Sequence, residues 1–183
     1  MGSQESILTP LVLIGAPGAG KTRLGKRVAH LLRVPFIDTY KAIVAVHGPI
    51  AQIFEEYGEA YFRRLEREAV VDALRTSAVV ALGGGAILDP HTQEDLRGIR
   101  VAQLTVSAEA VRSRIGGGKR PLVKGGIDDW IRLVDSRKAT YDSLARHTWD
   151  TSFRPLDDIA AEVADWVRHD SVTPTAAPKE LTQ

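Results

Sequence analysis

One octapeptide near the start of this chain restricts its fold more than any other feature. Residues 15–22 read Gly-Ala-Pro-Gly-Ala-Gly-Lys-Thr and directly follow the apolar run Leu-Val-Leu-Ile at 11–14. This pattern, G-x-x-x-x-G-K-[ST], is typical of a loop that joins a buried strand to a helix and binds phosphate groups. Its glycines leave room for backbone N–H groups to turn inward around the phosphates of a nucleotide. The sequence therefore predicts a strand, a phosphate loop and a helix in that order.

The chemistry expected at this loop is nucleotide binding with magnesium. Lys21 would bring positive charge to the β- and γ-phosphates, and the Thr22 hydroxyl is a suitable oxygen ligand for Mg²⁺. The residues expected to hold the nucleotide here are Gly15, Gly18, Ala19, Gly20, Lys21 and Thr22. A glycine turn that binds nothing is the alternative, and the apolar run before it and the helical stretch after it argue against that reading. We expect ATP or GTP as the ligand.

Composition is that of a compact globular protein. At 183 residues, with 44% hydrophobic and 26% charged residues, the chain has the length of one domain with a sizeable core. A net charge of +1 argues against nucleic acid or a membrane surface as the main partner. The absence of cysteine excludes disulfides and thiolate metal sites. No apolar run approaches the roughly 20 residues that cross a bilayer, and we expect a cytoplasmic protein.

Strands and helices are expected to alternate along the chain. Apolar runs predict strands at 11–15, 34–38, 77–82, 101–105 and 148–151. Helical patterns are found at 22–32, 59–74, 108–115, 128–146 and 156–168, with Asp128 as a candidate N-cap. A polar segment at 48–58 is expected to interrupt the pattern, the glycine-rich stretch 116–126 to form a loop, and 171–183 to be a disordered tail. This order predicts an α/β fold in three layers with a mainly parallel sheet.

Several polar or glycine-rich segments should meet at the carboxyl ends of those strands, where such folds bind ligands. Asp38 ends the second predicted strand and is suited to bind Mg²⁺ through water, or to cap a helix, and the two roles are compatible. Three glycines, Gly83, Gly84 and Gly85, end the third strand and allow a second substrate to approach the backbone. We call them the glycine turn. Arg120, in the glycine-rich loop, is expected to close over the phosphates as part of a lid.

The order and spacing of these segments resemble the shikimate kinase family. The resemblance runs from about Leu11 to Arg168. It rests on the phosphate loop, Asp38-Thr39, Phe62-Arg63-Arg64-Leu65-Glu66, the glycine turn, Arg120-Pro121-Leu122, and Arg137 four residues before Tyr141. It implies a single kinase domain over 1–170, with a five-stranded parallel sheet, a substrate-binding segment at about 39–66 and a lid at about 116–126. It also favours a monomer.

The resemblance implies a reaction and a set of residue roles. Such enzymes transfer the γ-phosphate of ATP to the 3-hydroxyl of shikimate, on the route to chorismate and the aromatic amino acids. Lys21, Asp38 and Arg120 would be catalytic, and Thr22 and Asp38 would serve the metal. The shikimate carboxylate would be held by Arg63 and Arg137, because guanidinium groups grip both carboxylate oxygens, and the glycine turn would meet the substrate with its N–H groups.

The adenine ring has its own expected contacts. By position in the family pattern, Arg112 and Pro155 would sandwich the ring. Arg114 lies nearby and could serve in place of Arg112.

One residue departs from the family pattern. The family carries Asp-x-Asp after the second strand, with the second aspartate near the reacting hydroxyl, whereas this chain reads Asp38-Thr39-Tyr40. That aspartate is the family's favoured candidate for the general base. Tyr40 cannot take this role, because a phenol with a pKa near 10 stays protonated at neutral pH. It can donate a hydrogen bond, form a larger wall of the acceptor pocket, or point elsewhere. Three outcomes stay open: a shikimate kinase with an altered base, a kinase for a related acceptor such as gluconate, and a weakened relative that senses ligands.

Overall fold

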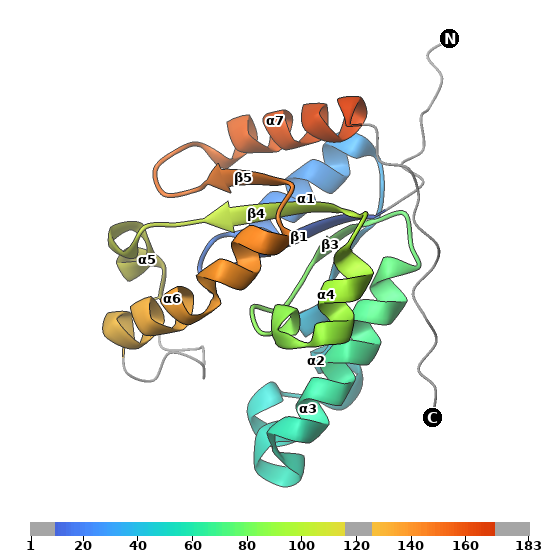
Figure 1. Ribbon diagram of the computed structural model, residues 1–183, viewed down its shortest axis with the longest axis vertical. Helices are drawn as coiled ribbons and strands as arrows, with labels where there is room; N and C mark the ends of the chain where they lie inside the picture. The colour runs from blue at the N-terminus through green and yellow to red at the C-terminus, as the bar shows by residue number, and fades with distance from the viewer. Residues whose placement is uncertain (1–9, 116–125, 171–183) are drawn as a thin grey trace.

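The computed structural model describes residues 10–115 and 126–170, and within them five parallel strands form one sheet (Figure 1). The strands are β1 (Leu11–Gly15), β2 (Phe36–Asp38), β3 (Val79–Ala81), β4 (Arg100–Thr105) and β5 (His147–Asp150). Their spatial order is β2-β3-β1-β4-β5, so that β1 is central. Each neighbouring pair is parallel. The predicted five-stranded parallel sheet is confirmed.

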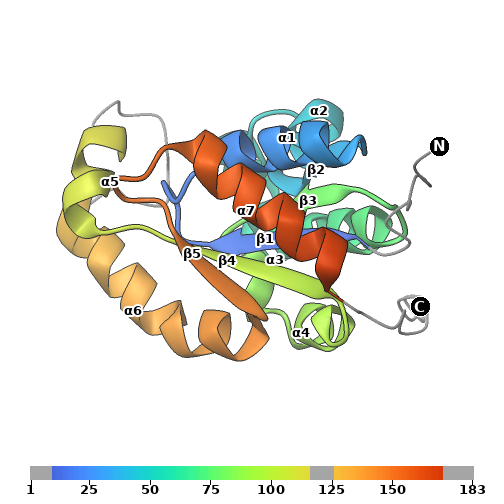
Figure 2. The same ribbon diagram turned by 90° about the horizontal axis from the view of Figure 1, so that it is seen from above.

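Helices cover both faces of the sheet, which confirms the three predicted layers (Figures 1 and 2). On one face lie α1 (Lys21–Leu32) and α7 (Leu156–His169). On the other lie α3 (Ile50–Leu74), α4 (Pro90–Leu96) and α6 (Gly126–Leu144). The other helical elements of the described residues are α2 (Thr39–His47), the 3-10 turn η1 (Ala86–Leu88) and α5 (Ala108–Ile115).

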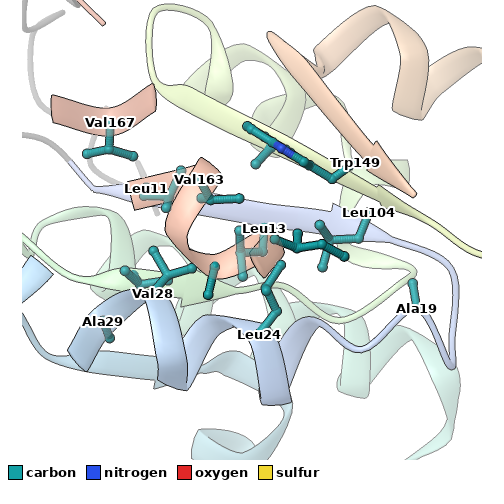
Figure 3. Close-up of a cluster of buried hydrophobic side chains, with 14 residues drawn as sticks. Leu11, Leu13, Ala19, Leu24, Val28, Ala29, Leu104, Trp149, Val163 and Val167 are labelled. Carbon is teal, nitrogen blue, oxygen red and sulfur yellow. The ribbon is translucent and has the colours of Figure 1, made fainter. Parts of the chain in front are cut away.

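The uninterrupted apolar character of β1 is explained by burial on both faces. Side chains alternate across a strand, and Leu11 and Leu13 enter the core against α1 and α7, as Figure 3 shows. Val12 and Ile14 enter the opposite core, under α3, α4 and α6. A central parallel strand with helices on both sides requires such a run. The phosphate loop therefore follows a strand whose residues are all buried.

The segment predicted to interrupt the pattern at 48–58 is non-helical only at Gly48 and Pro49, which separate α2 from α3. From Ile50 onward it is helical, and there the prediction was wrong. The first half of α3 packs back on α2, where Ile43, Ile50 and Ile53 bury with Phe62 in a small apolar cluster, the α2–α3 cluster. Gly58 has φ 79° and ψ 174°, so that α3 kinks there without ending. This positive φ is one that glycine adopts without steric cost. Gly58, which suggested a loop, thus permits a bend between two helical halves.

Smaller differences concern the ends of elements. Helix α6 begins at Gly126, so that Asp128 lies in its first turn and is not the predicted cap. Helix α4 was not expected, although Asp89 caps it by accepting from the Thr92 N–H at 2.9 Å. The predicted loop at 116–125 and the predicted tail at 171–183 lie outside the described residues. Within the described ranges no helix has the length and apolar character needed to cross a bilayer.

Candidate functional site

The phosphate loop has the backbone that its glycines predict. Gly15 has φ +139°, and a Cβ there would lie 2.2 Å from the Leu104 carbonyl oxygen, so that only glycine fits beside β4. Gly20, which precedes α1, has φ 88° and ψ 15°, in the left-handed region. Lys21 Nζ donates to the carbonyl oxygens of Gly15 at 2.7 Å and Ala16 at 3.1 Å. The ammonium group is therefore held over the loop on which phosphates are expected.

Side chains from distant elements hold the outer edge of this loop. The carbonyls of Pro17, Gly18 and Ala19 accept hydrogen bonds from Trp130, Arg114 and Thr151, respectively. In a trans peptide the carbonyl and the following N–H point in opposite directions. Because the carbonyls of Pro17 and Ala19 point toward the side chains that donate to them, the following N–H groups, those of Gly18 and Gly20, point away from these side chains. Such an arrangement is suited to cradling an anion.

Asp38 lies against the start of α1, as the sheet topology predicted. Its Oδ2 accepts from Thr22 Oγ1 at 2.6 Å, while its Oδ1 accepts from the Lys41 N–H at 3.1 Å and so caps α2. The structure therefore brings the two expected metal ligands together and also gives Asp38 its capping role. Within the described ranges there is no cluster of three or more acidic, histidine or cysteine ligands. A hydroxyl with one carboxylate fits Mg²⁺, which keeps several waters and takes its other ligands from phosphate.

The glycine turn lies directly above three charged side chains. A Cβ on Gly83 would lie 2.7 Å from Glu66 Oε1, and one on Gly85 would lie 2.4 Å from Arg63 Nη1. Any larger residue at these two positions would displace the Glu66 carboxylate or the Arg63 guanidinium from its place beside the turn. Arg137 Nη1 donates to the Gly84 carbonyl at 2.9 Å. Arg63, Arg137 and the glycine turn, predicted to act together, are thus brought together from α3, α6 and the end of β3.

Of the two adjacent arginines on α3, only one faces the site. Arg63 is half-buried and donates to Glu66 Oε2 at 2.6 Å, with a second ion pair to Glu59 at 3.1 Å. Arg64 is exposed and lies over the ring of Tyr61. Arg137, at 6% exposure, is buried, whereas its neighbour Lys138 is exposed. Two guanidinium groups therefore flank the glycine turn while the neighbouring cations face solvent.

Glu66 is a site residue to which sequence reasoning gave no role. It is only 5% exposed, and burial raises the pKa of its carboxyl, an effect that the nearby Arg63 opposes. Its position three residues after Arg63 is the signal that could have identified it, because residues at this spacing share a helix face. The carboxylate holds the Arg63 guanidinium in place beneath the turn.

Replacement of Glu66 by glutamine is expected to change how stability depends on pH. The raised pKa means that the folded state binds this proton more tightly than the unfolded chain. The stabilisation that comes from this tighter proton binding is therefore complete at pH values below the ordinary carboxyl pKa of 4.5. It is lost as the pH rises through the raised pKa of the folded state. The free energy of unfolding of Glu66→Gln, relative to wild type, should increase with pH over this window. A pKa that differs by one between the folded and unfolded states corresponds to about 1.36 kcal/mol.

Urea unfolding between about pH 4 and about pH 8 measures this difference. Glu68→Gln is the matched control, because Glu68 lies on the same helix and is exposed. A wild-type minus Glu66→Gln difference that stays flat across the window would contradict the raised pKa.

Tyr40 lies on the first turn of α2, two residues after Asp38. It is half-buried and packs against the α2–α3 cluster, which includes Ile43 and Phe62. Part of its ring is therefore engaged by apolar neighbours. Thr39, between the two, is fully buried, and its Oγ1 accepts from the Gly83 N–H at 3.2 Å. This hydrogen bond ties the start of α2 to the glycine turn.

The expected adenine contacts lie on the other side of the phosphate loop. Arg114 donates to the carbonyls of Thr151 at 2.7 Å and Ser152 at 3.0 Å, and so fastens α5 to the turn before α7. Arg112 is exposed on α5, and Pro155 precedes α7 on the same turn. That turn also presents Phe153, which is 72% exposed and to which sequence reasoning gave no role. The predicted roles of Arg112 and Pro155 stay predictions, and Arg120 lies outside the described residues.

Comparisons with known proteins agree on one family. A family model described as shikimate kinase matches residues 17–168. The shikimate kinase of Salinispora tropica is 44% identical over 157 residues, covering 84% of this chain and 94% of the relative. That of Thermobifida fusca is 43% identical over 157 residues, covering 84% and 91%. The solved structure of the Acinetobacter baumannii shikimate kinase in complex with shikimate has a TM-score of 0.83 at 31% identity, covering 89% of this chain and 94% of that one.

Proposed function

This chain belongs to the shikimate kinase family, and we propose that it transfers the γ-phosphate of ATP to the 3-hydroxyl of shikimate, with one loop of the site for each substrate. The main support for one binding loop per substrate is the short distance between the phosphate loop and the glycine turn. A Cβ on Gly84, in the glycine turn, would lie 3.6 Å from Pro17 Cδ in the phosphate loop. A phosphate donor on one loop and a small acid on the other would therefore meet.

The phosphate loop would hold the donor. The N–H groups of Gly18 and Gly20 and the Lys21 ammonium would neutralise the charge of the triphosphate, which is the main source of catalysis in phosphoryl transfer. Thr22 and Asp38, in contact at 2.6 Å, would hold the magnesium ion that accompanies ATP. That ion, when bound, supplies charge neutralisation on the phosphate oxygens. Arg112 and Pro155 would contact the adenine, and Arg120 would complete the positive charge around the phosphates.

The glycine turn and its two arginines would hold the acceptor. Arg63, kept in place by Glu66, and Arg137 would grip the carboxylate of shikimate. The N–H groups of Gly84 and Gly85 would bind its remaining oxygens, since the Gly83 N–H already donates to Thr39. The acceptor hydroxyl would then face the γ-phosphorus. A bond forms from the hydroxyl oxygen to phosphorus as the bond to the bridging oxygen of ADP breaks, and the hydroxyl proton ends in solvent. Positioning and charge supply most of the rate in this reaction, which lowers the need for a strong base.

Tyr40 would serve as a wall of the acceptor pocket. Its packing against the α2–α3 cluster supports this role more than a role in proton transfer. Removal of the hydroxyl in Tyr40→Phe is expected to raise the KM for shikimate by no more than about tenfold, because one such hydrogen bond contributes about 0.5–1.5 kcal/mol. Steady-state assays of Tyr40→Phe and wild type with shikimate measure this. Loss of kcat by more than about a hundredfold in Tyr40→Phe would place the phenol in the chemistry instead.

A coupled assay of ADP release with a panel of acceptors tests the function itself. We expect turnover that depends on shikimate in the wild-type protein. Turnover with gluconate but not with shikimate would support the kinase of another hydroxy acid. Activity that appears only in Tyr40→Asp would indicate a weakened relative, in which the replaced aspartate is needed for turnover.

We also propose that the protein acts as a cytoplasmic monomer on ATP and shikimate, without nucleic acid or membrane partners. A net charge of +1 supports the absence of a nucleic-acid partner, and the need for ATP supports the compartment. Size-exclusion chromatography with light scattering measures the oligomeric state. A dimer at the protein concentrations used in the assays would contradict the proposed monomer.

A further inference from the structure

Helix α6 contacts both loops of the site through a single face. Three of its side chains are buried: Trp130 at 3% exposure, Arg137 at 6% and Tyr141 at 3%. They are spaced seven and four residues apart, which brings all three to the same side of a helix with 3.6 residues per turn. We call these three residues the inner face of α6. The helix lies on the face of the sheet opposite α7 (Figure 1).

The two ends of the inner face hold different loops by the same type of bond. At one end, Trp130 Nε1 donates to the Pro17 carbonyl in the phosphate loop at 2.8 Å. At the other end, Arg137 Nη1 and Tyr141 Oη both donate to the Gly84 carbonyl in the glycine turn, each at 2.9 Å. Burial raises the pKa of the Tyr141 phenol, which keeps it protonated as a donor. One rigid helix of about 1.5 Å rise per residue thus connects the donor loop to the acceptor turn.

The two held residues are also neighbours. Pro17 Cδ would be 3.6 Å from a Cβ on Gly84, so that the proline ring of one loop lies beside the backbone of the other. Proline has a fixed φ near −65° and adds little flexibility to this contact. Because α6 donates to the Pro17 carbonyl on one side and to the Gly84 carbonyl on the other, it holds the two neighbouring loops together.

Trp130 is held in place by apolar packing and by a hydrogen bond. Its ring packs in a small apolar cluster with Ala16 of the phosphate loop and Val111 of α5. A buried indole N–H requires a partner, and here the partner is a carbonyl of the phosphate loop, 113 positions away in sequence. Trp130 therefore contacts the phosphate loop through both packing and a hydrogen bond.

We propose that Trp130 is a positioning residue for phosphoryl transfer, and that through α6 it sets the distance between the phosphate loop and the acceptor-binding turn. This proposal rests on the proposed function, because it concerns how the two substrates of that reaction meet. Trp130 would touch neither substrate and would act through Pro17. Loss of the Trp130–Pro17 hydrogen bond would misalign the reacting atoms, while each of the two loops would keep its own substrate-binding groups. A misplacement of about 1 Å can reduce a rate by about a hundredfold.

The variant Trp130→Phe tests the proposal, because it keeps an aromatic ring and removes the N–H donor. We expect kcat to fall by about 10-fold to about 100-fold. The KM values for ATP and shikimate should each change by less than about threefold. Trp166→Phe is the matched control, since Trp166 packs in the α1–α7 core on the opposite face of the sheet. It should leave kcat within about twofold of wild type. An unchanged kcat in Trp130→Phe, or an equal loss in both variants, would overturn the proposal.

A spectroscopic readout separates this proposal from the proposed function. The chain has three tryptophans, so that Trp149→Phe/Trp166→Phe leaves Trp130 as the sole emitter. We expect its emission to change on addition of MgADP alone, because the ring lies on the phosphate loop. If that double variant does not fold, the difference in MgADP response between wild type and Trp130→Phe gives the same measurement. No response would overturn the contact with the loop. A response in a protein that fails to phosphorylate shikimate would support the contact and contradict only the proposed reaction.

Discussion

Lys21→Ala is expected to lower kcat for shikimate phosphorylation by on the order of 10³-fold, a larger loss than we expect from the substitutions at Tyr40, Trp130 or Arg137. The Lys21 ammonium lies over the phosphate loop, 2.7 Å from the Gly15 carbonyl. It would act on charge that develops on the transferred phosphoryl group. An interaction made mainly in the transition state reduces kcat when it is removed, and does more than raise KM.

The matched control is Lys26→Ala, which removes an exposed lysine from the same helix. Steady-state kinetics with saturating MgATP and shikimate measure both variants, and thermal unfolding checks that both are folded. Lys26→Ala should retain wild-type kcat. Near-normal turnover in Lys21→Ala would contradict a catalytic role for Lys21, and with it the proposal that the phosphate loop binds the donor.

Arg137→Ala is expected to lower kcat/KM for shikimate by about 30-fold or more, while the KM for ATP changes little. Truncation of one partner in a buried, hydrogen-bonded charge pair costs about 2 kcal/mol or more, and about 1.4 kcal/mol corresponds to a factor of ten. Arg137 is buried beside the glycine turn, where its guanidinium would hold the acceptor carboxylate. Tyr141 still donates to the Gly84 carbonyl in this variant, so that this carbonyl keeps one of its two side-chain donors.

Two further variants sharpen this measurement. Lys138→Ala, next in sequence, removes an exposed cation paired with Asp142 and should leave kcat/KM unchanged. Arg137→Lys keeps the charge but cannot form the two-pronged contact with a carboxylate, and should recover only part of the loss. Equal losses in Arg137→Ala and Lys138→Ala would indicate a general electrostatic effect rather than a specific grip on the acceptor.

Local patterns predicted most of the sheet and much of the site. All five strands were anticipated, because an apolar run between turn residues indicates a strand wherever it is buried on both faces. Helix α5 was predicted to the residue at both ends. The segment 50–57 was missed, because it lies between Gly48 and Gly58 and its polar residues resemble a loop. As a helix it buries Ile50 and Ile53 against Ile43 of α2. Helix stability of this kind comes from tertiary contacts more than from propensity.

The spacing in residues 15–22 by itself predicted the nucleotide site, since a loop that cradles phosphates needs those residue types at consecutive positions. The tertiary structure decided which cations lie beside the glycine turn: Arg63 and Arg137 turn inward, while Arg64 and Lys138 face solvent. It also decided that Glu66 is buried beneath the glycine turn and that Trp130 reaches Pro17. These facts depend on the relative placement of α3, α6 and the sheet. Such contacts join residues far apart in the chain, and no local pattern records them.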